Sequence, residues 1–257
     1  MDSRGYLRGV EANLRQPLAD PARAAFEAGG GAELRAQGSR PPKMQALHSS
    51  AALAVNVFDH WADRDAAPLQ QSLRLDSKIL SLAFEAKFDT GLPGSPPNLD
   101  VALELDSGSV VGIESKFTEW LMPKRAHRQA FKDKYFEGGK TLWADRGLTR
   151  CQALAGDMLA GRSAFRYLDA AQLLKHALGL ATQRAGRCQL AYLYMDIPCP
   201  ASEAHREEID RFAERIDAAL AFSAESYQAL VRRMSAILGV DPEYLRYLRL
   251  RYCGDRA

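Results

Sequence analysis

The chain has 257 residues, 47% of them hydrophobic, which is enough to bury a core as one large domain or a domain with a helical extension. Lys and Arg total 34 and Asp and Glu total 32, so a polycation is excluded and any nucleic-acid contact must rely on locally concentrated positive charge. The four cysteines form no CxxC pair, which excludes a zinc ribbon and favours the reduced thiols of a cytosolic protein.

The N-terminal residues carry scattered charges and lack the apolar core of a signal peptide. The longest apolar stretch, around Ala51–Phe58, is too short to cross a bilayer. We therefore expect a cytoplasmic protein that has no membrane partner.

Residues 1–43 are rich in Ala, Arg and Gly and predict short helical pieces joined by a loop. In 44–62 the hydrophobic residues recur at helical spacing and predict a helix, with His48-Ser49-Ser50 at its cap or in its first turn. This change suggests an N-terminal extension at 1–43 and a main domain at 44–257 that ends in helices.

Three strand candidates follow at 79–88, 99–105 and 109–117. Asp106-Ser107-Gly108 predicts a hairpin turn between the last two, because Gly accepts a positive φ at little cost. Pairing about this turn places Asp100 opposite the stretch 114–116, with paired residue numbers that sum to about 215. The Pro- and Gly-rich stretch 91–98 predicts a loop that leads into Asp100.

Residues 121–187 are predicted to be mainly helical, most clearly at 169–184. A fourth strand is expected at 188–197, a helix at 202–217 and a fifth strand candidate at 220–226. Helices at 227–238 and 242–252 complete the chain. The order predicts a layered α/β protein with a mixed sheet.

The chemistry is expected at Asp100, Glu114 and Lys116. Residues two apart in a strand share a face, so Glu114 and Lys116 project together, and Asp100 can lie beside them across the hairpin. The carboxylates are hard oxygen ligands that suit Mg²⁺, which would stabilise charge on a phosphate and lower the pKa of a bound water. A solvated edge strand with an exposed ion pair would give the same pattern, and that alternative stays open.

Glu85-Ala86-Lys87 is a rival E-x-K pattern. Two features favour 114 and 116 over it. Asp100 lies upstream of Glu114 with a turn between them, whereas Asp76 upstream of Glu85 has no turn signal. Glu114 also follows an apolar run, where a charge is costly unless it is paired or used.

The chain resembles the PD-(D/E)XK nuclease superfamily, in particular a bacterial restriction-endonuclease-like branch, in two segments. These are PNLD, which ends at Asp100, and IESKFTEW, which contains Glu114 and Lys116. The stretches KMQALHSSAALAVNVF, FEAKF and QLLKHALGL extend the resemblance over about residues 40–200. One departure is Asn98-Leu99, which stand where the superfamily has Pro before the Asp.

This resemblance implies a restriction-endonuclease-like three-layer core, with a central mixed β-sheet flanked by helices. It also implies Mg²⁺ or Mn²⁺ as cofactor and phosphodiester hydrolysis, which we expect in DNA. Asp100 and Glu114 would be metal ligands, with Ser115 between the motif residues also at the metal. Lys116 would be the catalytic lysine.

Nucleases of this type often have a further polar side chain in the active site, contributed by a neighbouring helix or strand. Glu85 is predicted as an accessory ligand or orienting group, although a surface pair with Lys87 is the alternative. Gln172, on the helix after the third strand, is predicted to approach the site. His176 follows one turn later, and a lone His on an apolar helix is expected to be a core residue.

Two basic stretches are candidates for nucleic-acid contact. The first lies just after the presumed catalytic strand and includes Lys124, Arg125, Arg128 and Lys132, although a solvated helix face would look the same. In the second stretch, arginines are interleaved with tyrosines that could bind a nucleic-acid strand. Helical spacing favours the alternative that the tyrosines pack inward. Its members are Arg246, Arg249, Arg251, Tyr244, Tyr247 and Tyr252.

The sequence lacks the phosphate loops, the nucleophile elbow and the HExxH motif, which argues against kinases, dehydrogenases, serine hydrolases and metalloproteases. The main alternative to a nuclease is a catalytically inactive protein of the same fold that binds nucleic acid or a partner protein. A metal-dependent hydrolase of another phosphoester is a third option. Double-strand cutting needs two sites, so a homodimer is also considered.

Overall fold

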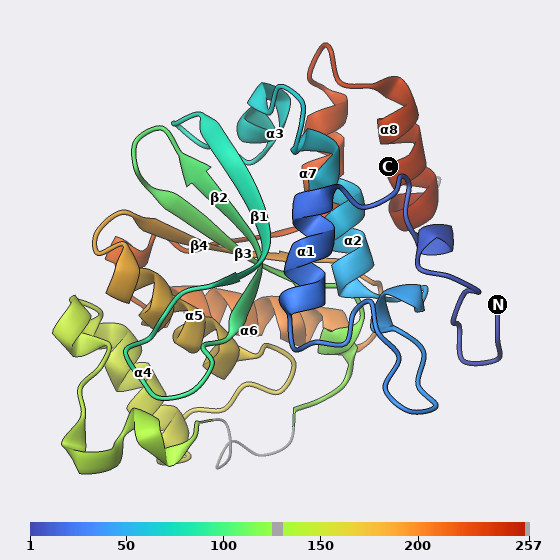
Figure 1. The fold of residues 1–257 in the computed structure, drawn as a ribbon. Helices are drawn as coiled ribbons and strands as arrows, with labels where there is room; N and C mark the ends of the chain where they lie inside the picture. Colours follow the sequence, from blue (N-terminus) through green and yellow to red (C-terminus); the bar gives the residue numbers. More distant parts are fainter. Residues whose placement is uncertain (125–130, 255–257) are drawn as a thin grey trace.

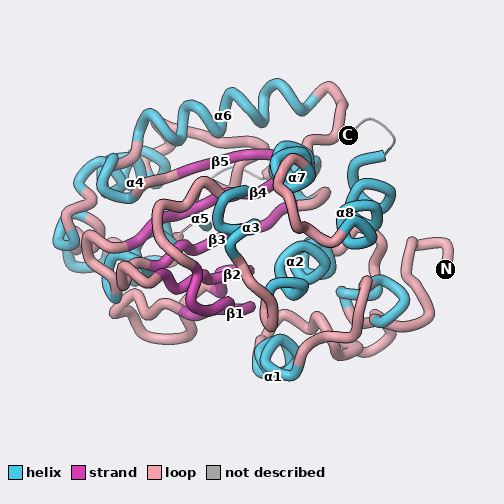
Figure 2. Tube along the Cα trace, turned by 90° about the horizontal axis from the view of Figure 1, so that it is seen from above, coloured by secondary structure: helices cyan, strands magenta, loops and turns pink. Residues whose placement is uncertain are grey.

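The computed structural model describes residues 1–124 and 131–254. Its five strands form one sheet in the order β1-β2-β3-β4-β5 (Figure 2). The first three strands are antiparallel neighbours, while β3–β4 and β4–β5 are parallel, so the sheet is mixed as predicted. The strands are β1 (Ile79–Lys87), β2 (Asn98–Leu105), β3 (Val110–Lys116), β4 (Cys188–Tyr194) and β5 (Ser223–Ser226).

Helices cover both faces of the sheet and give the three-layer α/β arrangement that the sequence predicts (Figure 1). On one face lie α4 (Thr149–Leu159), α5 (Ala170–Gln183) and α6 (Ala201–Arg215). On the other lie α1 (Asp20–Ala28), α2 (Ser50–Phe58), α7 (Tyr227–Ser235) and α8 (Pro242–Leu248), with the short α3 (Ala67–Ser72) beside α7.

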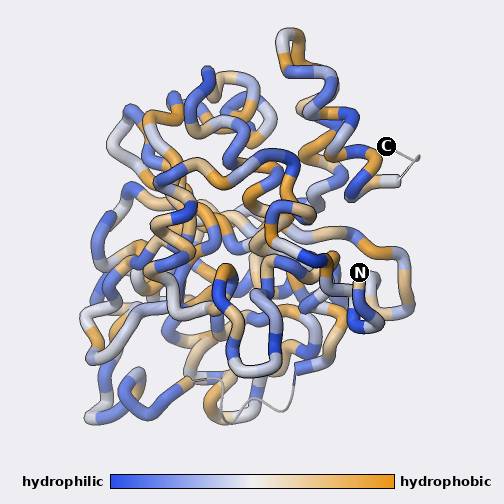
Figure 3. Tube along the Cα trace, turned by 45° about the vertical axis from the view of Figure 1, so that its right-hand side comes forward, coloured by the Kyte–Doolittle hydropathy of each residue, from blue (hydrophilic) through white to orange (hydrophobic). Residues whose placement is uncertain are grey.

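Each face of β3 contributes to a different hydrophobic core, which explains the apolar run before Glu114. Val110 packs on the α5 side, whereas Val111 and Ile113 pack on the α2 side. Along α7 and α8, by contrast, hydrophobic and hydrophilic residues alternate, as expected of helices with one buried face (Figure 3). The strand that carries the candidate site is therefore the buried centre of the sheet.

Residues 1–43 pack closely against the rest of the protein. The Phe26 ring on α1 lies 5.5 Å from that of Phe84 on β1. The side-chain amide of Asn13 donates to the carbonyl of Met44 at 2.8 Å, and the Asn56 side chain accepts the N–H of Arg15 at 2.7 Å. The boundary proposed after residue 43 stays a prediction.

The helix expected at 44–62 begins only at Ser50, because the Ser49 hydroxyl accepts the N–H of Ala52 at 3.1 Å and so caps it. Between 121 and 148 the prediction of mainly helical structure was wrong, since the described residues there form only short 3₁₀ turns. Stacking and edge contacts among aromatic rings hold this segment instead; Phe131 and Tyr135 both lie 5.8 Å from Trp143.

The cysteines are free, as the sequence predicts; all of them lie in the described residues. Within 1–124 and 131–254, no helix combines the length and the apolar composition needed to cross a bilayer.

Candidate active site

The hairpin brings Asp100 to the end of β3. Val101 pairs with Ile113 and Glu104 with Val110, one residue from the predicted register, and the next position places Asp100 opposite Glu114. There Oδ2 of Asp100 accepts the main-chain N–H of Ser115 at 2.6 Å. The carboxyl of Asp100 therefore lies against β3 beside the E-x-K residues.

In both β1 and β2, the side chains switch from one side of the sheet to the other at the level of Asp100. Glu85 has a φ of +50°, and the strand turns over there: Phe84 packs into the core on the α2 side and Ala86 into the core on the α5 side. β2 makes the same change around Asp100, which lies opposite Glu85 in the register. Left-handed backbone is costly for a residue with a side chain and tends to occur at functional sites.

Glu114 is almost completely buried and has a basic group near each oxygen. The Lys116 ammonium bonds its Oε1, and Nε2 of His176 lies 2.9 Å from its Oε2 without the alignment of a hydrogen bond. Burial opposes ionisation of Glu114, but Lys116 and His176 outweigh it and lower its pKa to about 2. Glu114 is thus an ionised carboxylate in the interior.

The pKa of Asp100 depends on the neighbouring carboxylate of Glu114. Burial and the charge of Glu114 raise the pKa of Asp100 well above its ordinary value, and Lys116 only partly opposes this rise. Burial by itself would lower the pKa of Lys116, but the charges of Glu114 and Asp100 raise it instead. The site therefore places two acidic groups beside one positive group, and one more cation would favour the ionised form of Asp100.

Glu85 lies at the edge of this group. Its Oε2 accepts the side-chain amide of Asn98 at 2.6 Å, and its charge adds to the rise in the pKa of Asp100. The surface pair with Lys87, the alternative that the sequence left open, is not among the ion pairs of the described residues.

Gln172 and His176 lie one turn apart on α5, so they share a helix face. The Asp169 side chain caps this helix by accepting the N–H of Gln172 at 3.0 Å. His176 is buried, as expected, but against Glu114 rather than in an apolar core, and sequence reasoning missed this role. The four-residue spacing from Gln172, already a site candidate, was the signal that could have found it.

One of the predicted nucleic-acid residues, Lys124, lies at the start of α5. Lys124 is 3.1 Å from Asp169, and Lys132 is exposed. Arg125 and Arg128 lie outside the described residues.

The donor set fits a hard divalent cation. The described residues contain no group of three or more His, Cys, Asp and Glu side chains arranged to hold a metal, so the side-chain ligands would be Asp100 and Glu114. Mg²⁺ typically takes one or two carboxylates, and Oε2 of Glu114 is a buried oxygen that lacks a hydrogen bond. The Ser115 hydroxyl lies 2.7 Å from that of Tyr227, in the core on the α7 side, so Ser115 could contribute only through its main chain.

Comparison with known proteins gives one family. Residues 6–253 match the family described as Restriction Endonuclease associating with ARP. No curated protein and no solved structure matches the chain at a significant level.

Proposed function

We infer the function from the premise that this chain belongs to the family described as Restriction Endonuclease associating with ARP. Its mixed sheet between two layers of helices is consistent with a restriction-endonuclease-like fold. Membership indicates a nuclease in general terms. We propose more specifically a divalent-metal-dependent endonuclease that hydrolyses phosphodiester bonds in DNA. The observation that carries this proposal is the meeting of Asp100, Glu114 and Lys116 at one end of β3.

Nucleases of this kind usually use divalent metals, and we propose Mg²⁺ or Mn²⁺ held by the carboxylates of Asp100 and Glu114 and the main chain of Ser115. The ion, when bound, would lower the pKa of a water and stabilise negative charge on the phosphate. The carboxylates of the chain hold the negative charge that attracts such an ion, and they are fixed before it arrives by the Ser115 N–H, Lys116 and His176.

Lys116 is better placed than Glu114 to meet the substrate. Its side chain is 15% exposed, while that of Glu114 is only 2% exposed. Its bond to Glu114 fixes the ammonium, which can donate to a phosphate oxygen and offset the charge that builds up as water attacks phosphorus. His176 acts as a positioning residue for Glu114, and Gln172 and Glu85 are proposed to orient the substrate or water nearby.

We make further proposals about nucleic-acid contacts, location and assembly. Lys124, Arg125, Arg128 and Lys132 are proposed to hold the DNA backbone. A cytoplasmic location and a homodimer, which would supply two sites for double-strand cutting, are proposed as well. The family description names an association with ARP; we propose this association for the chain too, with co-purification as its test.

The function is tested by incubating the protein with plasmid, linear duplex and single-stranded DNA in Mg²⁺ or Mn²⁺. We expect cleavage that EDTA stops and that excess Mg²⁺ restores, because both carboxylates need a cation between them. Cleavage that continues in EDTA would contradict the metal-dependent mechanism. DNA binding without cleavage under either metal would support the catalytically inactive alternative.

A further inference from the structure

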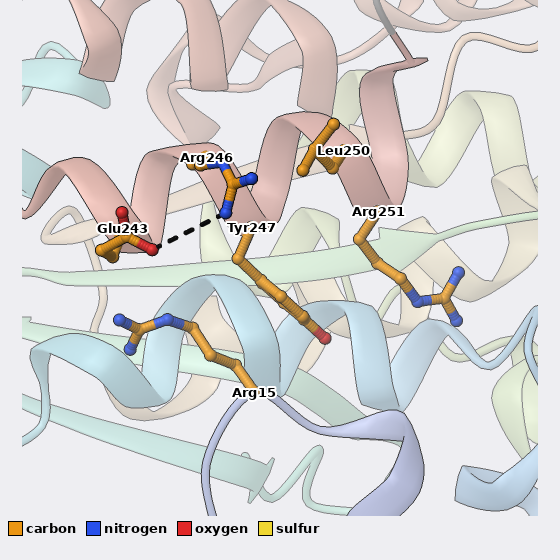
Figure 4. A pocket seen from close by; sticks show the side chains of 6 residues that line it. All are labelled: Arg15, Glu243, Arg246, Tyr247, Leu250 and Arg251. Carbon is orange, nitrogen blue, oxygen red and sulfur yellow. Dashed lines mark ion pairs between the residues drawn. The ribbon is translucent and has the colours of Figure 1, made fainter.

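A concave site lies on the C-terminal helix. It is a cavity of about 500 Å³ between α8 with the π-helical turn Arg249–Cys253 and the loop after the first 3₁₀ turn. Figure 4 shows the side chains that line it: Arg15, Glu243, Arg246, Tyr247, Leu250 and Arg251. This volume is in the range of about 300–1,000 Å³ that sites for small ligands occupy.

The cavity carries an excess of positive charge. Arg15 pairs with Asp241 at 2.9 Å, and Arg246 is 3.9 Å from Glu243 with both side chains largely exposed. Arg251 donates to two neutral oxygens, the side chain of Asn13 and the carbonyl of Leu47, and it belongs to no ion pair of the described residues. A guanidinium has several N–H donors, and those left over suit an anion such as a phosphate.

Only one of the three C-terminal tyrosines borders this cavity. Tyr244 is fully buried and donates to the carbonyl of Val57, and Tyr252 accepts the side-chain amide of Asn56. Both of these pack inward, as helical spacing predicts. Tyr247 instead lies between the side chains of Arg15 and Arg251 (Figure 4).

The charges around Tyr247 agree with this placement. Burial raises the pKa of Tyr247, and the positive charges of Arg251 and Arg15 both oppose that rise, so each acts on its hydroxyl. An aromatic ring flanked by two guanidinium groups resembles the platforms on which proteins stack nucleobases while holding the adjoining phosphates.

Ring contacts connect this platform with the candidate active site. The ring of Tyr247 meets that of Tyr252 at 6.5 Å, and Tyr252 meets Phe117 at 5.7 Å. Phe117 directly follows Lys116. The cavity thus lies at the same end of β3 as the proposed catalytic group.

We propose that this cavity binds one unpaired nucleotide of the DNA substrate, with its base stacked on Tyr247 and its phosphate held by Arg15 and Arg251. The inference rests on the proposed nuclease function. An intact duplex hides the faces of its bases, so it cannot use Tyr247. The site therefore selects DNA with a single-stranded end or segment near the bond to be cut.

The test measures binding by fluorescence anisotropy in EDTA, with a labelled single-stranded oligonucleotide and a blunt duplex of the same sequence. Tyr247→Leu is expected to weaken single-strand binding by about 5- to 150-fold and to leave duplex binding nearly unchanged. Arg15→Gln should weaken single-strand binding and reduce the slope of log affinity against log salt by about 0.7. Arg187→Gln, the same charge change at an exposed position beside the β2–β3 turn, is the control.

Thermal melting confirms that each variant is folded. If Tyr247→Leu binds single strands as the wild type does, or loses single-strand and duplex binding equally, the inference is wrong. Because binding is read without metal, the two proposals fail separately. A wild-type protein that binds but never cuts refutes the nuclease, whereas a wild type that cuts, together with a Tyr247→Leu variant that binds normally, refutes only the nucleotide site.

Discussion

Lys116→Ala is expected to slow DNA cleavage by roughly 10²- to 10⁴-fold, the range for removing a charged group that acts in the transition state. Lys116 is partly exposed, and its loss removes the positive charge proposed to act on the attacked phosphate. The measurement is the single-turnover cleavage rate in Mg²⁺. The control is Lys87→Ala, because Lys87 belongs to the rival E-x-K pattern and is exposed on β1. It should cut at the wild-type rate.

Folding must be checked in the same experiment. Without Lys116 the buried Glu114 keeps only His176 as a basic neighbour, and breaking a buried ion pair costs about 3–5 kcal/mol. Lys116→Arg keeps the charge and the pairing, so it should fold normally and still lose most activity, because a planar guanidinium does not replace a compact ammonium. If Lys116→Ala cuts normally while Lys87→Ala does not, the active site has been assigned to the wrong strand.

Asp100→Asn is expected to change activity and stability in opposite directions. Cleavage should fall by roughly 100-fold or more, since one of two carboxylate ligands is lost. The metal-free protein should become more stable by about 0.5–2 kcal/mol, as is common when an unfavourable functional residue is replaced. The gain comes from removing a carboxyl whose ionisation is opposed by burial and by Glu114, while the new amide oxygen can still accept the Ser115 N–H.

Cleavage assays and urea unfolding in EDTA measure these two effects. Glu104→Gln is the matched control on the same strand, where the carboxylate pairs with Arg184 at a half-exposed site, and it should leave both quantities close to wild type. A loss of stability in Asp100→Asn would indicate that Asp100 serves the fold rather than the chemistry.

The hairpin could be predicted because two local signals agree. Asp106-Ser107-Gly108 determines where the chain turns, and the alternation in 101–105 determines which residues face the same way. Together they place Asp100 opposite Glu114 to within one residue. The left-handed backbone at Glu85 could not be predicted in this way, because no glycine marks it and the change of face there depends on packing against two different cores.

Other features depend on contacts between distant segments. His176 becomes part of the site only because α5 crosses β3 at Glu114, and a single helix pattern does not reveal that crossing. Helical spacing indicates that the C-terminal tyrosines pack inward, and two of them do. Tyr247 packs against the same core and also lines a cavity next to the loop that carries Arg15. Residues 131–148 are held by aromatic packing, which has no sequence period.

The most direct test of the metal site is a crystal soaked in Mn²⁺ and measured for anomalous scattering. We predict a peak within bonding distance of the carboxyl oxygens of Asp100 and Glu114, and no such peak in crystals of Asp100→Asn. A manganese peak that touches neither carboxylate, in protein that cleaves DNA under the same conditions, would contradict this prediction.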